Sequence, residues 1–584
     1  MVEEIRYILN NADRKDPLEG LDINKETDDS VDGFPPIMTL TAMILRLWDD
    51  LGTATVISSM AFSINGGSFS ASFQIPSFDN EKHLRYGKMV EEIRYILNNA
   101  DKKDPLEGLV MIDTLQRLSI DYHFREEIES FLNTQYLNFT SPNHLPLDVF
   151  GAALCFRLLR QEGYSVSQEV FNNFKNEEGN FRFIQEKDVK GLMELYEASQ
   201  LRMESEDILD EAGELSARLL NHHESQIVAN TLEHPYHKSL ARLMVKNFLN
   251  NIDIRNENIK VFSELAKIDY EIVRSIHQKE IFQITDWWKD LGLAKELKFA
   301  RDQPLKWHMW SIFVLIDPNL SEQRVDLTKP ISLVYIIDDI FDLHGTLNDL
   351  SIFTEAVNEW DLTAANQLPE SMKISLKALF DTTESISTKI FEKRGWNPIE
   401  SLQKSWKKLC NAFLVEAKWF AHGEFPKSEE YLRNGIVSSG VHVVLVHMFF
   451  LLGQGINKET VDFVDGFPPI MALTAMILRL WDDLGTAKDE NQDGNDGSYL
   501  ECYTREHPNI TAGRARDHVI QLICDAWKKL NRECLSRPSP FSSTFTKACL
   551  NVARMTPLMY SYDDSPSHRS LKELMRSLAA HLVI

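Results

Sequence analysis

Apolar residues recur every three to four positions along most of the chain after about residue 80, as in the segment "DVFGAALCFRLLRQEGY". This spacing places apolar side chains along one face of an α-helix. No segment sustains the alternation of period two that is typical of half-buried strands. Turn signals such as "SPNH", "FPPI" and "RPSPF" separate the periodic segments. The pattern therefore predicts an all-α fold built from amphipathic helices.

A change in composition divides the predicted helices into two groups. All tryptophans except Trp48 lie at or beyond Trp287, and the later helices are richer in apolar residues. A chain of 584 residues is also too long for one domain of ordinary size. We therefore predict two helical domains, at 85–280 and 281–584. Residues 60–84, which open with the serine-rich "MAFSINGGSFSASFQ", are expected to form a loose segment before them.

Two stretches at the start of the chain repeat later ones almost unchanged. Residues 1–21 return at 89–109 with one substitution, and residues 23–54 return at 456–487 with three. The two offsets differ, whereas a solenoid would show one fixed period. We interpret residues 1–59 as duplicated fragments without a function of their own.

The charge and the cysteines exclude several classes of partner. A formal net charge of −25 argues against binding to nucleic acid or to an anionic membrane surface. It does not exclude an anionic substrate, because metal ions can reverse the sign of charge within a cleft. The six cysteines form no CxxC pair, which favours free thiols in a reducing compartment. The uncharged run 434–457 is interrupted by polar residues, so we predict a buried core helix there and no membrane span.

The segment "ISLVYIIDDIFDLHGT" carries the first candidate site. Asp338 and Asp342 are four residues apart and share one helix face, with Asp339 beside Asp338. The apolar lead-in predicts a buried helix, and buried carboxylates that repel one another need a cation. Mg²⁺ suits such oxygen ligands and often shares them with a phosphate. The alternative, a solvated acidic helix end, does not fit the apolar lead-in.

A second acidic motif lies in "LRLWDDLGTAKDENQDG". Asp482, Thr486 and Glu490 follow one another at intervals of four, so their oxygen atoms line one face over two turns. Arg479 lies three residues before Asp482, where a guanidinium can bind a phosphate oxygen. In the earlier copy of this segment Ile57 stands at the position of Glu490, so that copy lacks the third ligand.

Together the two motifs resemble those of plant class I terpene synthases. "DDIFD" is followed later in the same half by "DDLGTAKDE", and the similarity runs from about residue 85 to Ile584 through "FRLLRQEGY", "GLMELYEASQL", "WWKDLGL" and "FARDQPLKWHMW". The resemblance implies an N-terminal α-barrel-like domain and a C-terminal helical bundle of the class I terpenoid synthase type. It also implies three Mg²⁺ ions, with Mn²⁺ as an alternative, and a monomer. The implied metal ligands are Asp338, Asp339, Asp342, Asp482, Thr486 and Glu490.

The resemblance also assigns residues to a geranyl or farnesyl diphosphate substrate. The family's diphosphate-binding Arg-x-Arg falls on Arg301 and on position 303, where Gln303 replaces the second positive charge. Arg479 matches the arginine before the second metal motif. The residues expected to bind the substrate, directly or through metal, are Arg301, Asp338, Asp342, Arg479 and Asp482.

Three further features match the family's active site. Trp310 matches an aromatic residue that faces the carbocation, although plain core packing is the alternative for a lone tryptophan. Tyr560 begins "YSYDDSP", which matches a lid-like stretch near the C-terminus. The segment 434–442, "NGIVSSGVH", matches a kinked helix, with Gly440 at a local unwinding.

Two absences bear on the product. No DxDD motif occurs, which argues against protonation-initiated cyclisation. The tandem arginines with a tryptophan that precede the first domain in many cyclic-monoterpene synthases are missing as well. With "FARDQPLKW" and "NGIVSSGVHVVLVH", the chain resembles the subfamily that makes acyclic tertiary alcohols, linalool from geranyl diphosphate and nerolidol from farnesyl diphosphate. The alternatives are a cyclic mono- or sesquiterpene product, a chain-elongating prenyltransferase, and a helical scaffold without activity.

The compartment decides which diphosphate such an enzyme meets. "MAFSINGGSFSASFQ" is rich in serine and poor in acids, like a plastid transit peptide, but it is short and contains no arginine. We therefore favour the cytoplasm over the plastid.

Overall fold

The computed structural model describes residues 80–99, 104–140, 148–178, 181, 188–251, 257–489, 497–560, 573 and 575. The chain divides into two compact units, Met1–Ser58 and Ser59–Ile584, and every described residue belongs to the second. The duplicated segment 1–59 and residues 60–79 lie outside the described residues, and residues 80–84 begin the first described helix. Within the described residues there is no β-strand, only an isolated bridge between Lys175 and Phe181. The prediction of an all-α fold is confirmed.

The first group of helices surrounds its own hydrophobic core. Phe124, Phe156 and Phe171 are fully buried in it, together with Leu195 and Leu209. Each helix buries one apolar face in this core, as the spacing of its apolar residues requires. The group comprises α3 (Asn80–Leu97), α4 (Pro105–Arg117), α5 (Arg125–Phe139), α6 (Val149–Gln161), α7 (Val189–Ser199), α8 (Asp207–Leu220), α9 (Gln226–Glu233) and α10 (Ala241–Asn251).

The second group surrounds a larger core and carries both acidic motifs. Trp307, Phe313, Phe353, Trp406 and Phe449 are buried in it. The group comprises α12 (Leu293–Glu296), α13 (Pro304–Val314), α14 (Ser321–Leu343), α15 (Leu347–Glu359), α16 (Glu370–Arg394), α17 (Ile399–His422), α18 (Ser428–Ser438), α19 (Val441–Leu452), α20 (Lys458–Asp465), α21 (Pro469–Asp489), α22 (Tyr499–Glu506), α23 (Ala512–Leu535) and α24 (Ser543–Tyr560).

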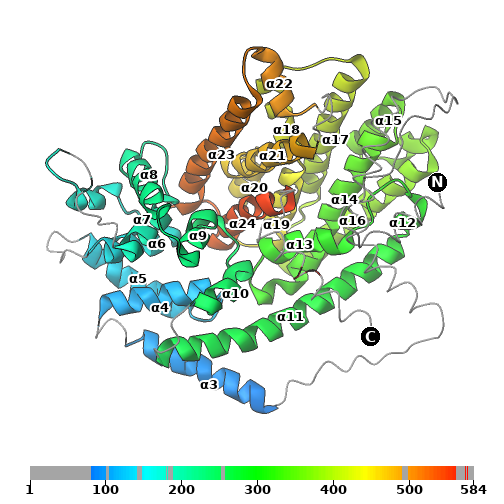
Figure 1. Ribbon diagram of the computed structural model, residues 1–584. Helices are drawn as coiled ribbons and strands as arrows, with labels where there is room; N and C mark the ends of the chain where they lie inside the picture. The colour runs from blue at the N-terminus through cyan, green and yellow to red at the C-terminus, as the bar shows by residue number, and fades with distance from the viewer. Residues whose placement is uncertain are drawn as a thin grey trace, which may run out of the picture. The chain divides into compact units, whose positions relative to one another are not determined.

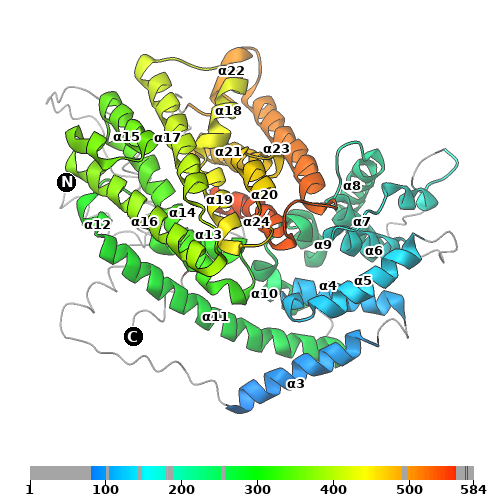
Figure 2. The ribbon, with the colours of Figure 1, turned by 180° about the vertical axis from the view of Figure 1, so that it is seen from behind.

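One helix, α11 (Glu257–Leu291), belongs to both groups. It runs without interruption for 35 residues and passes along both groups in the two views of Figures 1 and 2. Its first half buries Phe262 and Leu265 in the first core, and its second half buries Ile281 and Trp288 in the second core. The predicted boundary between residues 280 and 281 therefore falls inside a continuous helix, and the position of that boundary stays a prediction.

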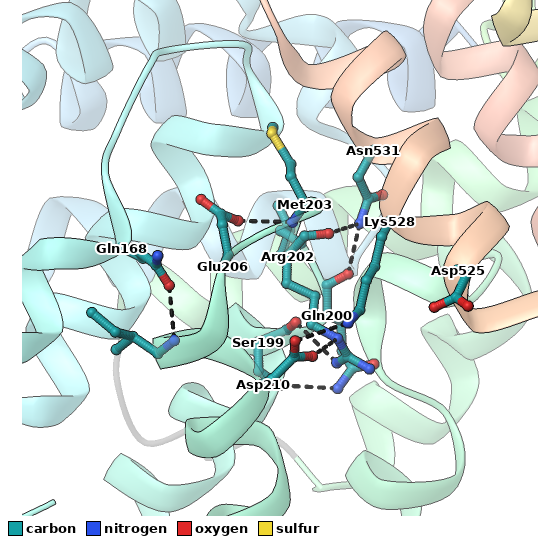
Figure 3. A network of polar contacts seen from close by, with 12 residues as sticks. Gln168, Ser199, Gln200, Arg202, Met203, Glu206, Asp210, Asp525, Lys528 and Asn531 are labelled. Atoms are coloured by element: carbon teal, nitrogen blue, oxygen red, sulfur yellow. Dashed lines mark hydrogen bonds and ion pairs between the residues drawn. The ribbon is translucent and has the colours of Figure 1, made fainter. Parts of the chain in front are cut away.

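A polar network joins the end of α7 and the start of α8 to α23 (Figure 3). The Asp210 carboxylate lies 2.8 Å from Arg202 Nε and 2.8 Å from Lys528 Nζ. The side-chain amide of Asn531 donates to the backbone carbonyls of Gln200 and Arg202, at 3.0 and 2.9 Å. A partly buried network of this kind fixes geometry better than an isolated surface ion pair. It holds α23, which packs on the motif helix α21, against the first group.

A buried charged network ties α11, α13 and α14 together. Glu280 of α11 accepts hydrogen bonds from Arg324 of α14, from Nη2 at 2.6 Å and from Nε at 3.1 Å. His308 Nε2 of α13 lies 3.2 Å from the same carboxylate. Burial alone would raise the pKa of Glu280, but its hydrogen bonds with His308 and Arg324 lower that pKa to about 2. The network anchors the two helices that carry Trp310 and the first acidic motif.

By length and composition alone, two described stretches could cross a bilayer. They are Ser428–Leu452 and Lys458–Gly485. In the first, 78% of the most apolar window is buried inside the protein, and the helix is interrupted at Gly440. Such burial is typical of a core helix, as the sequence predicted for 434–457. The second stretch is half buried, at 50%, and contains α20 and α21. Both stretches are therefore weak evidence for a membrane span.

Candidate active site

The first acidic motif lies in the last turns of α14. Tyr335, Asp338 and Asp342 remain accessible to solvent there, whereas Ile336 and Ile340 are buried. Residues three and four apart share a helix face, so these three side chains form one accessible stripe beside the buried side of the helix. The structure thus brings Asp338 and Asp342 together on one face, as the sequence predicted.

Asp339 is only 3% exposed and fixes the loop that precedes α13. Its carboxylate accepts the backbone N–H of Arg301 at 2.7 Å and lies 2.9 Å from Arg301 Nε. Asp338 pairs with Nη2 of the same guanidinium. The loop is fixed a second time where the indole N–H of Trp288 donates to Asp302 at 2.7 Å. Arg301 is therefore held at the edge of the first motif.

The two adjacent aspartates of α21 also have different environments. Asp483 is 4% exposed, accepts the backbone N–H of Tyr499 at 2.9 Å and lies 3.1 Å from Arg479 Nε. The Tyr431 hydroxyl donates to Asp483 at 3.1 Å and accepts from Arg479 Nε at 3.0 Å. Asp482 remains partly accessible. In each motif, then, the first aspartate is accessible and the second is buried and holds an arginine.

The carboxylates of the two motifs influence one another across the site. Burial raises the pKa of Asp482 to about 7. The negative charges of Asp483 and Asp338 add to this rise, and the positive charge of Arg479 opposes it. Desolvation by the surrounding protein, together with the charge of Asp338, raises the pKa of Asp342 well above its ordinary value. The arginines thus leave negative charge uncompensated. Among the described residues no three His, Cys, Asp or Glu side chains lie close enough to enclose an ion. A divalent cation that shares its coordination with substrate oxygens fits this donor set.

The remaining predicted ligands are described only in part. Thr486 lies within α21, but its side chain and the whole of Glu490 are outside the described residues. Their metal-binding roles stay predictions. Gln303, which stands where the family has its second arginine, is 4% exposed and immediately precedes α13. It adds no charge to the site, where the described residues place Arg301 beside the first motif and Arg479 beside the second.

Aromatic side chains form a wall near both motifs. The indole N–H of Trp310 donates to the Tyr335 hydroxyl at 3.1 Å, and the ring centroids of Trp310 and Tyr560 are 6.5 Å apart. Tyr560 is the last residue of α24, and burial raises its pKa well above the ordinary value. The negative charges of Asp482 and Asp338 add to this rise, so both motifs act on Tyr560. The structure therefore brings Trp310 and Tyr560 together.

A helix break faces α14 beside this wall. α18 ends at Ser438 and α19 begins at Val441, and Gly440 between them has a φ of +71°. A Cβ added to Gly440 would lie 2.4 Å from Val334 Cγ1 on the accessible side of α14. The predicted unwinding within 434–442 is confirmed. Glycine is required here for two reasons, a left-handed backbone and a close approach between helices.

Replacing Gly440 by alanine is expected to destabilise the protein and to reduce its activity. The left-handed backbone and the contact with Val334 together cost about 2–4 kcal/mol. Thermal melting and diphosphate release measure the two effects. Gly513→Ala is the matched control, because Gly513 lies in α23 with nothing within 4 Å of an added Cβ. A Gly440→Ala variant that melts with the wild type would contradict this account of the break.

A cavity of about 610 Å³ lies next to the aromatic wall. Trp481, Leu484 and Tyr560 line it from the second group of helices, and Tyr196 of α7 and Met244 of α10 line it from the first. It shares Tyr560 with the wall but includes none of the metal-motif aspartates. The cavity is therefore adjacent to the acidic motifs and does not surround them.

Three residues of the site were not singled out from the sequence: Tyr335, Tyr431 and Asp483. Tyr335 lies three residues before Asp338, so the helical spacing that relates Asp338 to Asp342 also places Tyr335 on their face. Asp483 is adjacent to a predicted ligand, but adjacency gives no sign of which aspartate is buried. Tyr431 is 48 residues from Arg479, and only the packing of α18 on α21 reveals the contact.

Two acidic helices whose carboxylates act on one another, with an arginine fixed beside each, form in this all-α bundle a site suited to divalent metal ions and an anionic ligand.

Comparison with known proteins identifies the class more closely. Residues 59–242 match the family model for the terpene synthase N-terminal domain, and residues 289–529 match the model for the metal-binding domain of the terpene synthase family. The chain is 53% identical over 506 residues to a probable terpene synthase 4 of Ricinus communis, covering 85% of this chain and 89% of the relative. It is 48% identical over 508 residues to an (E)-nerolidol synthase of Cannabis sativa, covering 84% and 91%. It is also 48% identical over 523 residues to the S-(+)-linalool synthase, chloroplastic, of Arabidopsis thaliana, covering 87% and 91%.

Solved structures agree with the sequence relatives. The isoprene synthase of grey poplar leaves, in complex with three Mg²⁺ ions and dimethylallyl-S-thiolodiphosphate, superposes with a TM-score of 0.78 at 33% identity, over 86% of this chain and 98% of that one. A limonene synthase with 2-fluorolinalyl diphosphate gives a TM-score of 0.80 at 32% identity, over 85% and 94%. The chain belongs to the terpene synthase family, and it is a lyase that acts on prenyl diphosphates.

Proposed function

We propose that this terpene synthase ionises geranyl or farnesyl diphosphate and captures the cation with water, releasing diphosphate and an acyclic tertiary alcohol, linalool or nerolidol. The observation that carries the proposal is the similarity, at 48% identity, to both a nerolidol synthase and a linalool synthase. The missing tandem-arginine and tryptophan motif supports it. A cyclic mono- or sesquiterpene is the alternative, favoured by the fold match to a limonene synthase.

We assign the residues of the site three roles according to their chemistry: acidic residues bind metal ions, arginines bind diphosphate, and aromatic residues face the cation. The metal ions, three Mg²⁺ with Mn²⁺ as a substitute, would be held by Asp338, Asp342 and Asp482, with Asp339, Thr486 and Glu490 as further predicted ligands. When bound they would supply positive charge to the departing diphosphate. Arg301 and Arg479 would bind the same group, and the ion pairs of their guanidinium groups with Asp339 and Asp483 support this role. Trp310 and Tyr560 would line the apolar side, where an aromatic face attracts an allylic cation.

Product analysis by gas chromatography tests this proposal. Purified enzyme with Mg²⁺ is given geranyl diphosphate and farnesyl diphosphate in separate reactions, and we expect linalool from the first and nerolidol from the second. A cyclic hydrocarbon as the main product from both would establish the alternative. Addition of isopentenyl diphosphate serves as a control, because a chain-elongating prenyltransferase would then form a longer prenyl diphosphate.

The compartment, the assembly and the domain roles are proposed on narrower grounds. The Arabidopsis linalool synthase is named as chloroplastic, which supports a plastid location for this enzyme and does not support our preference for the cytoplasm. We propose a monomer, which light scattering would test.

We further propose that residues 281–584 carry the reaction and that residues 85–280 support them. The fragments at 1–59 are proposed to be dispensable, because Ile57 stands there in place of Glu490.

A further inference from the structure

The cavity beside the aromatic wall has an excess of positive charge in its lining. Its volume of about 610 Å³ lies in the range of cavities that hold a small organic ligand. Among the described residues that line it are two arginines and a lysine, Arg516, Arg554 and Lys238, and a single carboxylate, Glu233. The Glu233 side chain is 50% exposed and lies 3.4 Å from His234 Nε2. The described lining therefore carries more positive than negative charge.

Two of these cations lie close together and interact with neutral groups. Arg554 Nε donates to the His237 carbonyl at 2.6 Å, and its Nη1 donates to Asn551 Oδ1 at 2.8 Å. Lys238 follows His237 directly in the chain, and its Nζ lies 5.8 Å from the ring centroid of Trp527, which also lines the cavity. The hydrogen bond to the His237 carbonyl therefore brings the Arg554 guanidinium to the backbone beside Lys238.

Positive charge in such a setting is costly unless an anion binds beside it. Burial lowers the pKa of Lys238 to about 8 and that of Arg554 to about 10, as expected for cations that are withdrawn from water without a countercharge. Guanidinium groups bind phosphate oxygens in pairs, and lysine adds a point charge. Two arginines and a lysine therefore match the several charges of a diphosphate better than the single charge of a carboxylate.

Much of the remaining lining is apolar and comes from both groups of helices. It includes Leu243 and Met244 of α10, Trp481 and Leu484 of α21, and Ile520 of α23. An inorganic anion would leave these side chains in contact with water, whereas an apolar chain attached to the anion would cover them. The protein acts on prenyl diphosphates, a class of molecule in which a diphosphate head is joined to an apolar chain.

From this lining we propose that the cavity is a second binding site for a prenyl diphosphate, outside the catalytic site. Lys238, Arg516 and Arg554 bind the diphosphate, and the apolar side chains bind the prenyl chain. The site works without metal ions, because its described lining contains cations in place of the metal-motif aspartates. The bound molecule contacts Trp481, which precedes Asp482 in α21, and so touches the helix of the second motif. This inference is independent of which product the enzyme forms.

The number of molecules bound per chain, with and without metal, tests this site. The probe is radiolabelled farnesyl S-thiolodiphosphate, in which sulfur replaces the bridging oxygen so that the enzyme does not turn it over. Equilibrium dialysis of the full chain is expected to give one bound molecule in EDTA, in the cavity. With Mg²⁺ the catalytic site binds a second molecule. A wild type that binds none in EDTA overturns the proposal.

Variants of the lining show whether the molecule bound in EDTA lies in the cavity. Lys238→Gln and Arg516→Gln are each expected to weaken this binding about ten- to a hundredfold, the effect of losing one charged hydrogen bond. Arg514→Gln is the matched control, because Arg514 is exposed on the same helix as Arg516 and lies outside the lining. Binding to Lys238→Gln and Arg516→Gln that equals binding to Arg514→Gln overturns the site. Either variant is decisive if the other cannot be purified.

Competitors in EDTA test the class of ligand. Farnesyl diphosphate should displace the probe at lower concentrations than dodecanoate, which has an apolar chain and one charge, or inorganic diphosphate, which has no chain. Equal displacement by dodecanoate overturns the choice of a diphosphate head, and equal displacement by inorganic diphosphate overturns the role of the apolar lining. None of these outcomes affects the proposed alcohol product, because product analysis reports on the catalytic site.

Discussion

Replacing Asp338 by alanine is expected to reduce turnover at least a hundredfold while the protein still folds. Asp338 is accessible on the stripe of α14, and its charge acts on Asp342 and Asp482, so it lies where both motifs meet. Loss of one group that stabilises a developing charge costs about 10²–10³ in rate. Diphosphate release at saturating substrate and Mg²⁺ measures the loss, and circular dichroism confirms the fold.

The variant should leave Arg301 in place, because Asp339 still holds both its backbone N–H and its Nε. Asp381→Ala is the matched control. Asp381 is exposed on α16 and pairs with Lys377 at the surface, so its removal should leave activity unchanged. Near-normal turnover in Asp338→Ala would show that the first acidic motif is not a metal site.

Replacing Glu280 by glutamine is expected to lower the free energy of unfolding of the second group of helices by about 3 kcal/mol or more. The substitution keeps the size of the side chain but leaves Arg324, which is 0% exposed, without a countercharge. Because Arg324 anchors α14 on α11, the first acidic motif should lose order as well. The shift in the urea midpoint, followed by tryptophan fluorescence, measures the effect.

The pH dependence of this effect has a definite sign. Glu280 has a pKa of about 2 in the folded protein against an ordinary value of 4.5, so it stabilises the fold fully above pH 4.5. Its contribution is lost as the pH falls from 4.5 towards 2, and the difference between the two proteins should shrink over that range. Glu91→Gln is the control, since Glu91 forms an exposed pair with Arg94 and should cost less than about 1 kcal/mol. Equal midpoints for Glu280→Gln and Glu91→Gln would contradict the assignment.

The sequence predicted the kind of fold well, because local periodicity determines it. Apolar spacing identified the helices, and the resemblance of 434–442 to the family's kinked helix placed the break at Gly440. Local patterns did not reveal that α11 continues across both cores. Its residues Phe262 and Trp288 are buried in different cores, and nothing in their spacing distinguishes one partner from another.

Helical spacing predicted the part of the candidate site that lies along single helices. Spacing grouped Asp338 with Asp342, and the apolar residues before them indicated that their helix is largely buried. It could not show that Asp339 and Asp483 hold arginines, because that depends on which neighbour each face of the helix meets. It also gave no sign of the hydrogen bond between Trp310 and Tyr335, which joins two helices.

The continuity of α11 determines how this enzyme can be dissected. A catalytic fragment that starts at residue 281 would begin in the middle of a helix and would lose Glu280, leaving Arg324 buried without its carboxylate. A fragment that starts at Glu257 would keep the ion pair but would expose Phe262 and Leu265. No cut within α11 separates two self-sufficient parts, so the two halves of this protein have to be studied, expressed and engineered as one piece.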